Sequence, residues 1–97
     1  MSADHVNYNP RWDSSVGGVR WERVRDTTRY DRCVALREAI DHLREGSGDQ
    51  AKADPVAIFE LHEAKFSEAA LKKIESFASD EQGDFIVGKA DLVALGY

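Results

Sequence analysis

The sequence predicts a mainly α fold, in which an extended N-terminal arm precedes three to four short helices and one small β-pair is allowed. Two observations favour helices: apolar residues recur at spacings of three and four from residue 33 onward, and Asp54-Pro55 is a typical helix start. A third observation sets the arm apart, because residues 1–18 are polar and rich in turn formers. We therefore expect an arm over residues 1–25 and a small helical domain over 26–97. An α+β fold is the alternative.

The arm contains one segment with strand character. Asn9-Pro10 and Gly17-Gly18 are typical of turns. Residues 19–25 allow a short strand, although Val19 and Trp21 would share one face while Val24 lies on the other. We expect this part of the chain to be extended or only partly ordered.

The first predicted helix covers residues 28–46. Thr28 and Asp31 have the spacing of a capping box, and Gly46 has the character of a C-terminal cap. The apolar residues between them follow the helical period: Cys33, Leu36, Ile40 and Leu43. Residues 46–53 then predict a flexible loop.

Two further helices are predicted before an acidic loop. Asp54 is an N-cap residue and Pro55 suits the first helical position, so a helix is expected over 55–66, with a strand at 56–61 as the alternative. Ser67 is expected to cap the next helix. Its apolar stripe consists of Ala70, Leu71, Ile74, Phe77 and Ala78.

The C-terminal part contains the only local pattern with a recognisable mechanism. An acidic loop at 79–84 is followed by a β-prone run at 85–87 and by a last short helix after Gly88. Residues 67–95 resemble a degenerate EF-hand. Its loop positions one, three, five and twelve would be Asp80, Gln82, Asp84 and Asp91. Calcium loops need a sharp turn at position six, where this chain has Phe85 instead of Gly, so the resemblance implies a helix-loop-helix with weak or no calcium binding.

Charged and aromatic residues are divided between the two halves of the chain. Residues 1–45 hold eight Arg and eight acids, whereas residues 46–97 hold five Lys and ten acids and carry the whole net charge of −5. Arg, Trp and Tyr are the residue types that anchor interfaces. The predicted partner-binding residues are therefore Tyr8, Arg11, Trp12, Arg20, Trp21, Arg23 and Arg25. Two alternatives remain open: Trp21 belongs to the core instead, or the Arg pair with carboxylates of the chain's own acidic half or of a second copy.

Composition and motifs exclude several function classes. An acidic chain is a poor nucleic-acid binder, and no apolar run approaches the ~18 residues that span a bilayer. The three His and Cys33 lack the spacing of a metal site, so we expect no cofactor and no enzymatic activity. The start of the sequence lacks a signal-peptide pattern, and a single cysteine is typical of the reducing cytoplasm.

The functional expectation is a small cytoplasmic protein-binding protein, acting as an adaptor, a regulator, an inhibitor or a subunit of a larger complex. Its partner would be another protein or a second copy, contacted through the arm. One alternative is the degenerate EF-hand module. The other is an inhibitor that mimics nucleic acid and therefore needs clustered acids on one face: Asp80, Glu81, Asp84 and Asp91.

Overall fold

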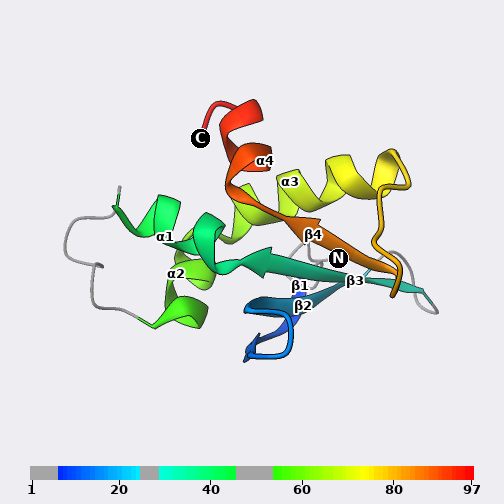
Figure 1. The fold of residues 1–97 in the computed structure, drawn as a ribbon, viewed down its shortest axis with the longest axis horizontal. Helices are drawn as coiled ribbons and strands as arrows, with labels where there is room; N and C mark the ends of the chain where they lie inside the picture. The colour runs from blue at the N-terminus through cyan, green and yellow to red at the C-terminus, as the bar shows by residue number, and fades with distance from the viewer. Residues whose placement is uncertain (1–6, 25–28, 46–53) are drawn as a thin grey trace, which may run out of the picture.

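The computed structural model describes residues 7–24, 29–45 and 54–97, which form four strands and four helices. Three strands come first, followed by three helices, a fourth strand and a last helix (Figure 1). In chain order these are β1 (Asn7–Asp13), β2 (Gly18–Val24), β3 (Tyr30–Leu36), α1 (Arg37–Glu45), α2 (Pro55–Leu61), α3 (Glu63–Glu75), β4 (Asp84–Val87) and α4 (Lys89–Ala94).

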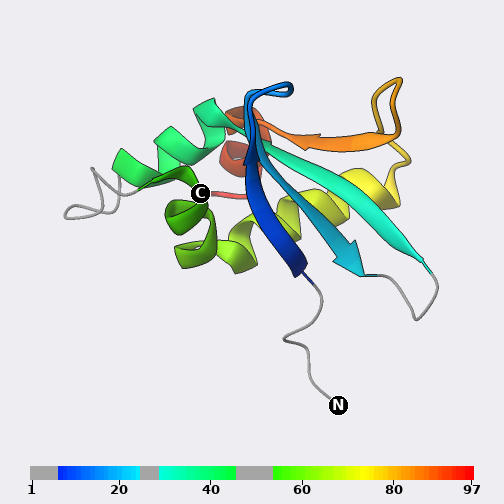
Figure 2. The same ribbon diagram turned by 90° about the horizontal axis from the view of Figure 1, so that it is seen from below.

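The four strands form one mixed sheet in the order β1-β2-β3-β4. The pairs β1–β2 and β2–β3 are antiparallel, whereas β3 and β4 are parallel and are connected through α1, α2 and α3. A crossover of this kind is what a parallel pair requires. The helices gather on one face of the sheet, so the fold has two layers (Figure 2).

The mainly α prediction is wrong, because the fold is α+β. The expected arm forms strands β1 and β2 of the sheet, and the first half of the helix predicted over 28–46 is strand β3. Cys33 and Ala35 point into the core in strand alternation, and β3 pairs with β2 along its whole length. Strand pairing decides the structure of residues 30–36, although the spacing of Cys33 and Leu36 predicted a helix there. The helical spacing holds only within α1. Some predictions concern residues that lie wholly or partly outside the described ranges: the boundary at 25/26, the caps at Thr28 and Gly46, and the loop at 46–53.

The predicted start of the second helix is confirmed, but its end is not. The Asp54 side chain accepts a hydrogen bond from the Ala57 backbone N–H at 2.9 Å, and Pro55 opens α2. The helix ends at Leu61, and α3 begins at Glu63, so the expected cap at Ser67 is wrong. Ser67 lies inside α3 and its hydroxyl accepts a hydrogen bond from Arg23 Nε at 3.3 Å.

At the C-terminus, the β-prone run and the last helix are confirmed as β4 and α4, whereas the helix-loop-helix is wrong. The parallel pairing of β4 with β3 places residues 84–87 within the sheet instead of within a loop between two helices. The backbone N–H of Gly88 donates to Asp91 Oδ2 at 2.8 Å and so fixes the start of α4.

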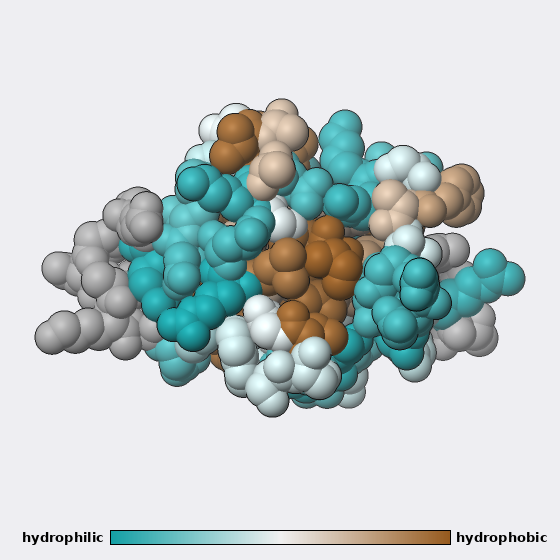
Figure 3. Space-filling view, in the orientation of Figure 1, coloured by the Kyte–Doolittle hydropathy of each residue, from teal (hydrophilic) through white to brown (hydrophobic). Residues whose placement is uncertain are grey.

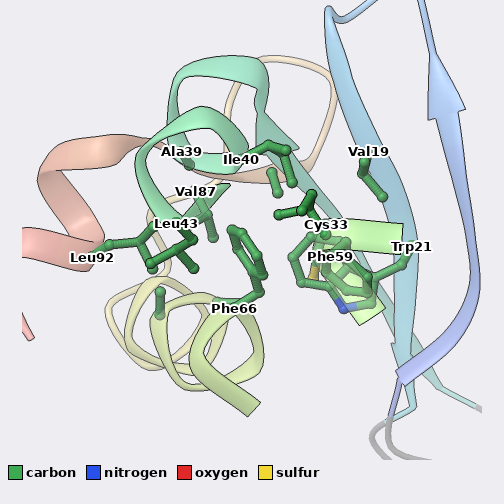
Figure 4. Close-up of a cluster of buried hydrophobic side chains, with 14 residues drawn as sticks. Val19, Trp21, Cys33, Ala39, Ile40, Leu43, Phe59, Phe66, Val87 and Leu92 are labelled. Atoms are coloured by element: carbon green, nitrogen blue, oxygen red, sulfur yellow. The ribbon is translucent and has the colours of Figure 1, made fainter. Parts of the chain in front are cut away.

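Three aromatic rings join the two layers. Trp21 of β2 lies 4.6 Å from Phe59 of α2, and Phe59 lies 5.2 Å from Phe66 of α3, measured between ring centroids (Figure 4). All three side chains are fully buried. Trp21 also donates from Nε1 to Asn7 Oδ1 at 3.0 Å, which satisfies its one polar group. The core therefore depends on a residue of the expected arm.

Candidate functional site: the helix-free face of the sheet

Strand alternation gives the sheet two different faces. Val19 and Trp21 of β2 point toward the helices, so Arg20, Glu22 and Val24 point away from them. In the described part of the chain, no helix covers that second face (Figure 2). The strand register shows which residues of β1, β3 and β4 lie on the same face as these β2 residues. We call this set the helix-free face: Tyr8, Arg11, Asp13, Arg20, Glu22, Val24, Tyr30, Arg32, Val34, Asp84 and Ile86.

Arg20 is the centre of an ion-pair network on this face. Its Nε donates to Asp13 Oδ2 at 2.8 Å, and its two terminal nitrogens donate to Asp84 Oδ1 and Oδ2 at 3.0 and 3.4 Å. Arg32 Nε lies 3.3 Å from the same Asp84 carboxylate, which is 4% exposed. One nearly buried carboxylate therefore joins β2, β3 and β4.

The network shifts the pKa of its members. The hydrogen bonds to Asp84 and Asp13 raise the pKa of Arg20, although desolvation opposes them. The Ser15 hydroxyl, which donates to Asp13 Oδ1 at 2.6 Å, and the Arg20 guanidinium lower the pKa of Asp13 to about 2. Asp13 and Arg20 therefore both carry their charges at neutral pH, which favours the ion pair between them.

A second ion pair crosses from β1 to β2. Arg11 donates to both carboxylate oxygens of Glu22, at 3.0 and 2.9 Å, in the bidentate geometry that suits a guanidinium. Its side chain is 40% exposed, whereas that of Glu22 is 16% exposed. The outer part of this pair is therefore open to solvent.

One end of the helix-free face displays aromatic and apolar side chains. Tyr8 and Tyr30 are each 61% exposed and Val24 is 37% exposed. The register places Val24 opposite Tyr30, and Glu22 opposite both Tyr8 and Arg32, so these residues are neighbours on the surface. Exposed tyrosines beside arginines are the composition of a protein contact surface.

The other end has an apolar centre. Val34 is fully buried but lies outside the main core, and Ile86 is paired with it from β4. Figure 3 shows an apolar area over β3 and β4 that is bordered by hydrophilic residues. Val34 adds no accessible area, so the apolar surface at this end comes from partly exposed neighbours such as Ile86, beside the paired charges.

The structure divides the predicted partner-binding residues between the two faces. Tyr8, Arg11 and Arg20 lie on the helix-free face. The helix side holds the fully buried Trp21, Trp12, which is 39% exposed, and Arg23. Arg25 lies outside the described residues. Trp21 is a core residue and is unavailable to a partner in this fold.

The residues of the face that sequence reasoning missed include Glu22, Val24, Tyr30 and Arg32. Three of them alternate with buried neighbours, since Trp21 precedes Glu22 and Asp31 lies between Tyr30 and Arg32. The signal that would have found them is this period of two across residues 18–24 and 30–36. It was obscured in 28–46 by the helical spacing of the apolar residues.

The four candidate calcium ligands do not converge on a common point. Asp80 Oδ1 accepts from the backbone N–H groups of Gln82 and Asp84, whereas the Asp84 side chain binds Arg20 and Arg32. Asp91 binds the Gly88 N–H and Lys73. Over residues 7–24, 29–45 and 54–97, no group of three His, Cys, Asp or Glu is arranged to hold a metal. The same pairings leave Asp84 and Asp91 poorly suited to mimic free phosphates.

Cys33 is fully buried, and burial is the main reason why its thiol pKa is raised to about 12. A thiol in this environment stays protonated and is a poor nucleophile. It therefore supplies packing, beside Trp21 in the register of β2 and β3.

Comparison with known proteins adds information on the fold. No protein-family model and no curated protein matches the chain significantly. The structure is similar to a crystal structure of a protein of unknown function from the DUF1488 family, from Shewanella loihica PV-4. The TM-score is 0.67 at 20% identity, and the match covers 91% of this chain and 98% of the other. Such a likeness supports the α+β architecture over nearly the whole chain and carries no functional conclusion.

Among the residues that the structure describes, no helix is both long and apolar enough to cross a membrane.

Proposed function

We propose that this chain is a non-enzymatic protein-binding protein, an adaptor or regulator, whose contact surface is the helix-free face of its sheet. The observation that carries the proposal is the exposure of Tyr8, Tyr30 and Val24 beside Arg11 and Arg32. Tyrosine offers large contact area with two rotatable side-chain bonds, so its immobilisation in a complex costs little conformational entropy.

The charges of the face favour a protein partner over a polyanion. Three guanidinium groups (Arg11, Arg20 and Arg32) are matched by three carboxylates (Asp13, Glu22 and Asp84), and ion pairs join them. A face with balanced charge releases few counterions from a nucleic acid and gains little affinity from its phosphates. We accordingly propose a partner with an apolar surface and polar groups that bind the tyrosine hydroxyls.

The proposal includes a cytoplasmic setting. Its support is the single free cysteine, which is buried and unpaired with any other thiol. An oxidising compartment favours small domains that are held by disulfides, and this chain relies on an aromatic core instead.

A capture experiment with matched surface variants tests the proposal. Full-length protein, a Tyr8→Ser/Tyr30→Ser variant and a Leu61→Ser control are immobilised and exposed to lysate of the source cell. Leu61 is 55% exposed on α2 and lies on the other side of the molecule from the sheet face, so it matches the loss of exposed apolar area. Circular dichroism and thermal unfolding of all three proteins establish that each is folded.

We expect a partner that the wild type and the Leu61 variant retain and that the double tyrosine variant loses by about 10-fold or more, as for interface tyrosines. Equal retention by all three proteins would exclude the helix-free face as the contact surface. Loss in the Leu61 variant alone would point to a contact on the helix side.

A further inference from the structure

Phe77 is an exposed aromatic residue in a backbone conformation that favours glycine. It follows the C-cap residue Ser76 at the end of α3, with φ of 54°. The backbone N–H of Phe77 donates to Ile74 O at 3.1 Å, and that of Ala78 donates to Lys73 O at 2.9 Å. This is the hydrogen-bond arrangement of a helix terminus in which the left-handed residue is usually Gly.

The Phe77 side chain contributes little to the fold that contains it. It is 90% exposed, more than any other large apolar residue that the structure describes. Its conformation is disfavoured for a residue with a Cβ atom, and exposure of the ring leaves apolar area in water. Both the backbone conformation and the exposed ring of Phe77 are unfavourable for the folded chain alone, which suggests that the ring contacts another molecule.

A cavity lies directly beside this residue. It has a volume of about 450 Å³ and opens between α3 and α4, where Ala69, Ala94 and Leu95 supply apolar lining. Lys72, Lys73 and Asp91 add charged side chains to the lining, and Ser76, the neighbour of Phe77, completes it. The volume is within the range of ~300–1,000 Å³ that ligand pockets occupy and leaves room for an aromatic ring.

Phe77 directly follows Ser76, which lines the cavity, so the ring and the cavity lie close together toward the C-terminal end of α3. A two-fold axis between them would bring the ring of each copy to the cavity of the other, which is the self-complementary geometry of an isologous dimer. We propose that this protein forms a two-fold dimer in which Phe77 of each copy inserts into the α3–α4 cavity of its partner.

The charges beside the two features are complementary. The loop that follows Phe77 carries Asp80 and Glu81, both exposed, whereas Lys72 at the cavity is an exposed cation. Lys73 is already held by Asp91 at 3.3 Å, so Lys72 is the better partner for the acidic loop. In a reciprocal contact, the acidic loop of each copy approaches Lys72 of the other, and the pairing favours a second copy as the occupant.

This dimer uses a surface separate from the helix-free face, so it does not depend on the proposed function. Its test is sedimentation velocity of the full-length protein between about 1 μM and 1 mM. Wild type is expected to show concentration-dependent dimerisation. Phe77→Gly removes both rings from the dimer. If each ring contributes about tenfold in affinity, the dimer dissociation constant rises by about 100-fold.

A second variant and a control separate contact from folding. Ala94→Glu places a charge on the exposed cavity wall without altering Phe77, and it should weaken dimerisation by a similar factor. Tyr30→Ser removes an exposed aromatic from the sheet face and should leave dimerisation unchanged. Phe77→Gly should unfold at the same temperature as wild type or above it, because glycine suits the left-handed position.

A mixture gives the sharpest result. Phe77→Gly keeps an intact cavity and Ala94→Glu keeps an intact ring, so the two variants together should form a weak heterodimer that neither forms with itself. Wild type that stays monomeric at 1 mM, or dimerisation that persists in both variants, would overturn the proposal. Growth into larger assemblies would overturn the reciprocal geometry, because it indicates a head-to-tail contact.

Discussion

Replacement of Arg20 by Met should destabilise the fold by about 2–3 kcal/mol. The substitution retains most of the side-chain length but removes the donors to Asp84 and Asp13. Hydrogen bonds to charged groups contribute roughly 1.5–3 kcal/mol, and loss of one partner of a buried ion pair costs roughly 3–5 kcal/mol. Asp84 keeps Arg32 at 3.3 Å, and the Arg20 side chain is 17% exposed, so the expected loss lies below the upper value.

The assay is urea denaturation followed by tryptophan fluorescence, in which Trp21 changes from fully buried to exposed while Trp12 is already 39% exposed in the folded state. A change of this size lowers the melting temperature by roughly 10–20 °C in a domain of this length. Arg11→Met is the matched control. Its ion pair with Glu22 is more exposed, at 40% for the arginine, and such pairs contribute about 0–1 kcal/mol.

A double-mutant cycle with Asp84→Asn separates the interaction from the effect of each residue alone. A coupling near 2 kcal/mol is expected between Arg20 and Asp84. The reasoning is refuted if Arg20→Met costs no more than Arg11→Met, or if the coupling is below about 0.5 kcal/mol. Either result would mean that water and Arg32 satisfy the Asp84 carboxylate without Arg20.

Two further predictions concern the strands that flank this network. In Gly18→Ala, the new Cβ would lie 2.4 Å from Ala35 O, so β2 and β3 must separate. The free energy of unfolding measured by urea denaturation should therefore fall by about 3 kcal/mol or more. Stability close to that of wild type would contradict the close approach of the two strands. Cys33, with a pKa of about 12, should react with a thiol reagent at pH 8 at least ~100-fold more slowly in the native state than in urea. Because that pKa is raised in the folded state, the thiol's contribution to stability is fully present below its ordinary value of 9.0 and falls as the pH rises from there toward 12. Rapid native labelling would show that Cys33 is accessible.

Part of the fold could be predicted from local chemistry. Asp54-Pro55 begins a helix because the carboxylate binds a free backbone N–H and proline lacks one, and neither effect needs the rest of the molecule. The run at 85–87 and the helix after Gly88 are also local signals. Elements of this kind were identified correctly.

The rest depends on pairing between distant segments. Residues 30–36 form a strand because β2 and β4 lie on either side of them, and no window of sequence contains that information. The contact between Arg20 and Asp84 joins residues 64 positions apart. The sequence did raise the alternative that arginines pair with the chain's own acidic half, and this contact confirms it for Arg20.

Arginine suits the strands of this sheet better than lysine, although Arg37 and Arg44 lie on helix α1. Arg11, Arg20 and Arg32 lie on adjacent strands roughly 4.8 Å apart, where a planar guanidinium can bind carboxylates on two neighbours. The described lysines instead lie on helices α3 and α4: Lys65, Lys72, Lys73 and Lys89. An ammonium at position 20 would bind one carboxylate as a point charge and leave the other without its partner. Arg20→Lys should therefore resemble Arg20→Met in stability more than it resembles wild type, although it conserves the charge.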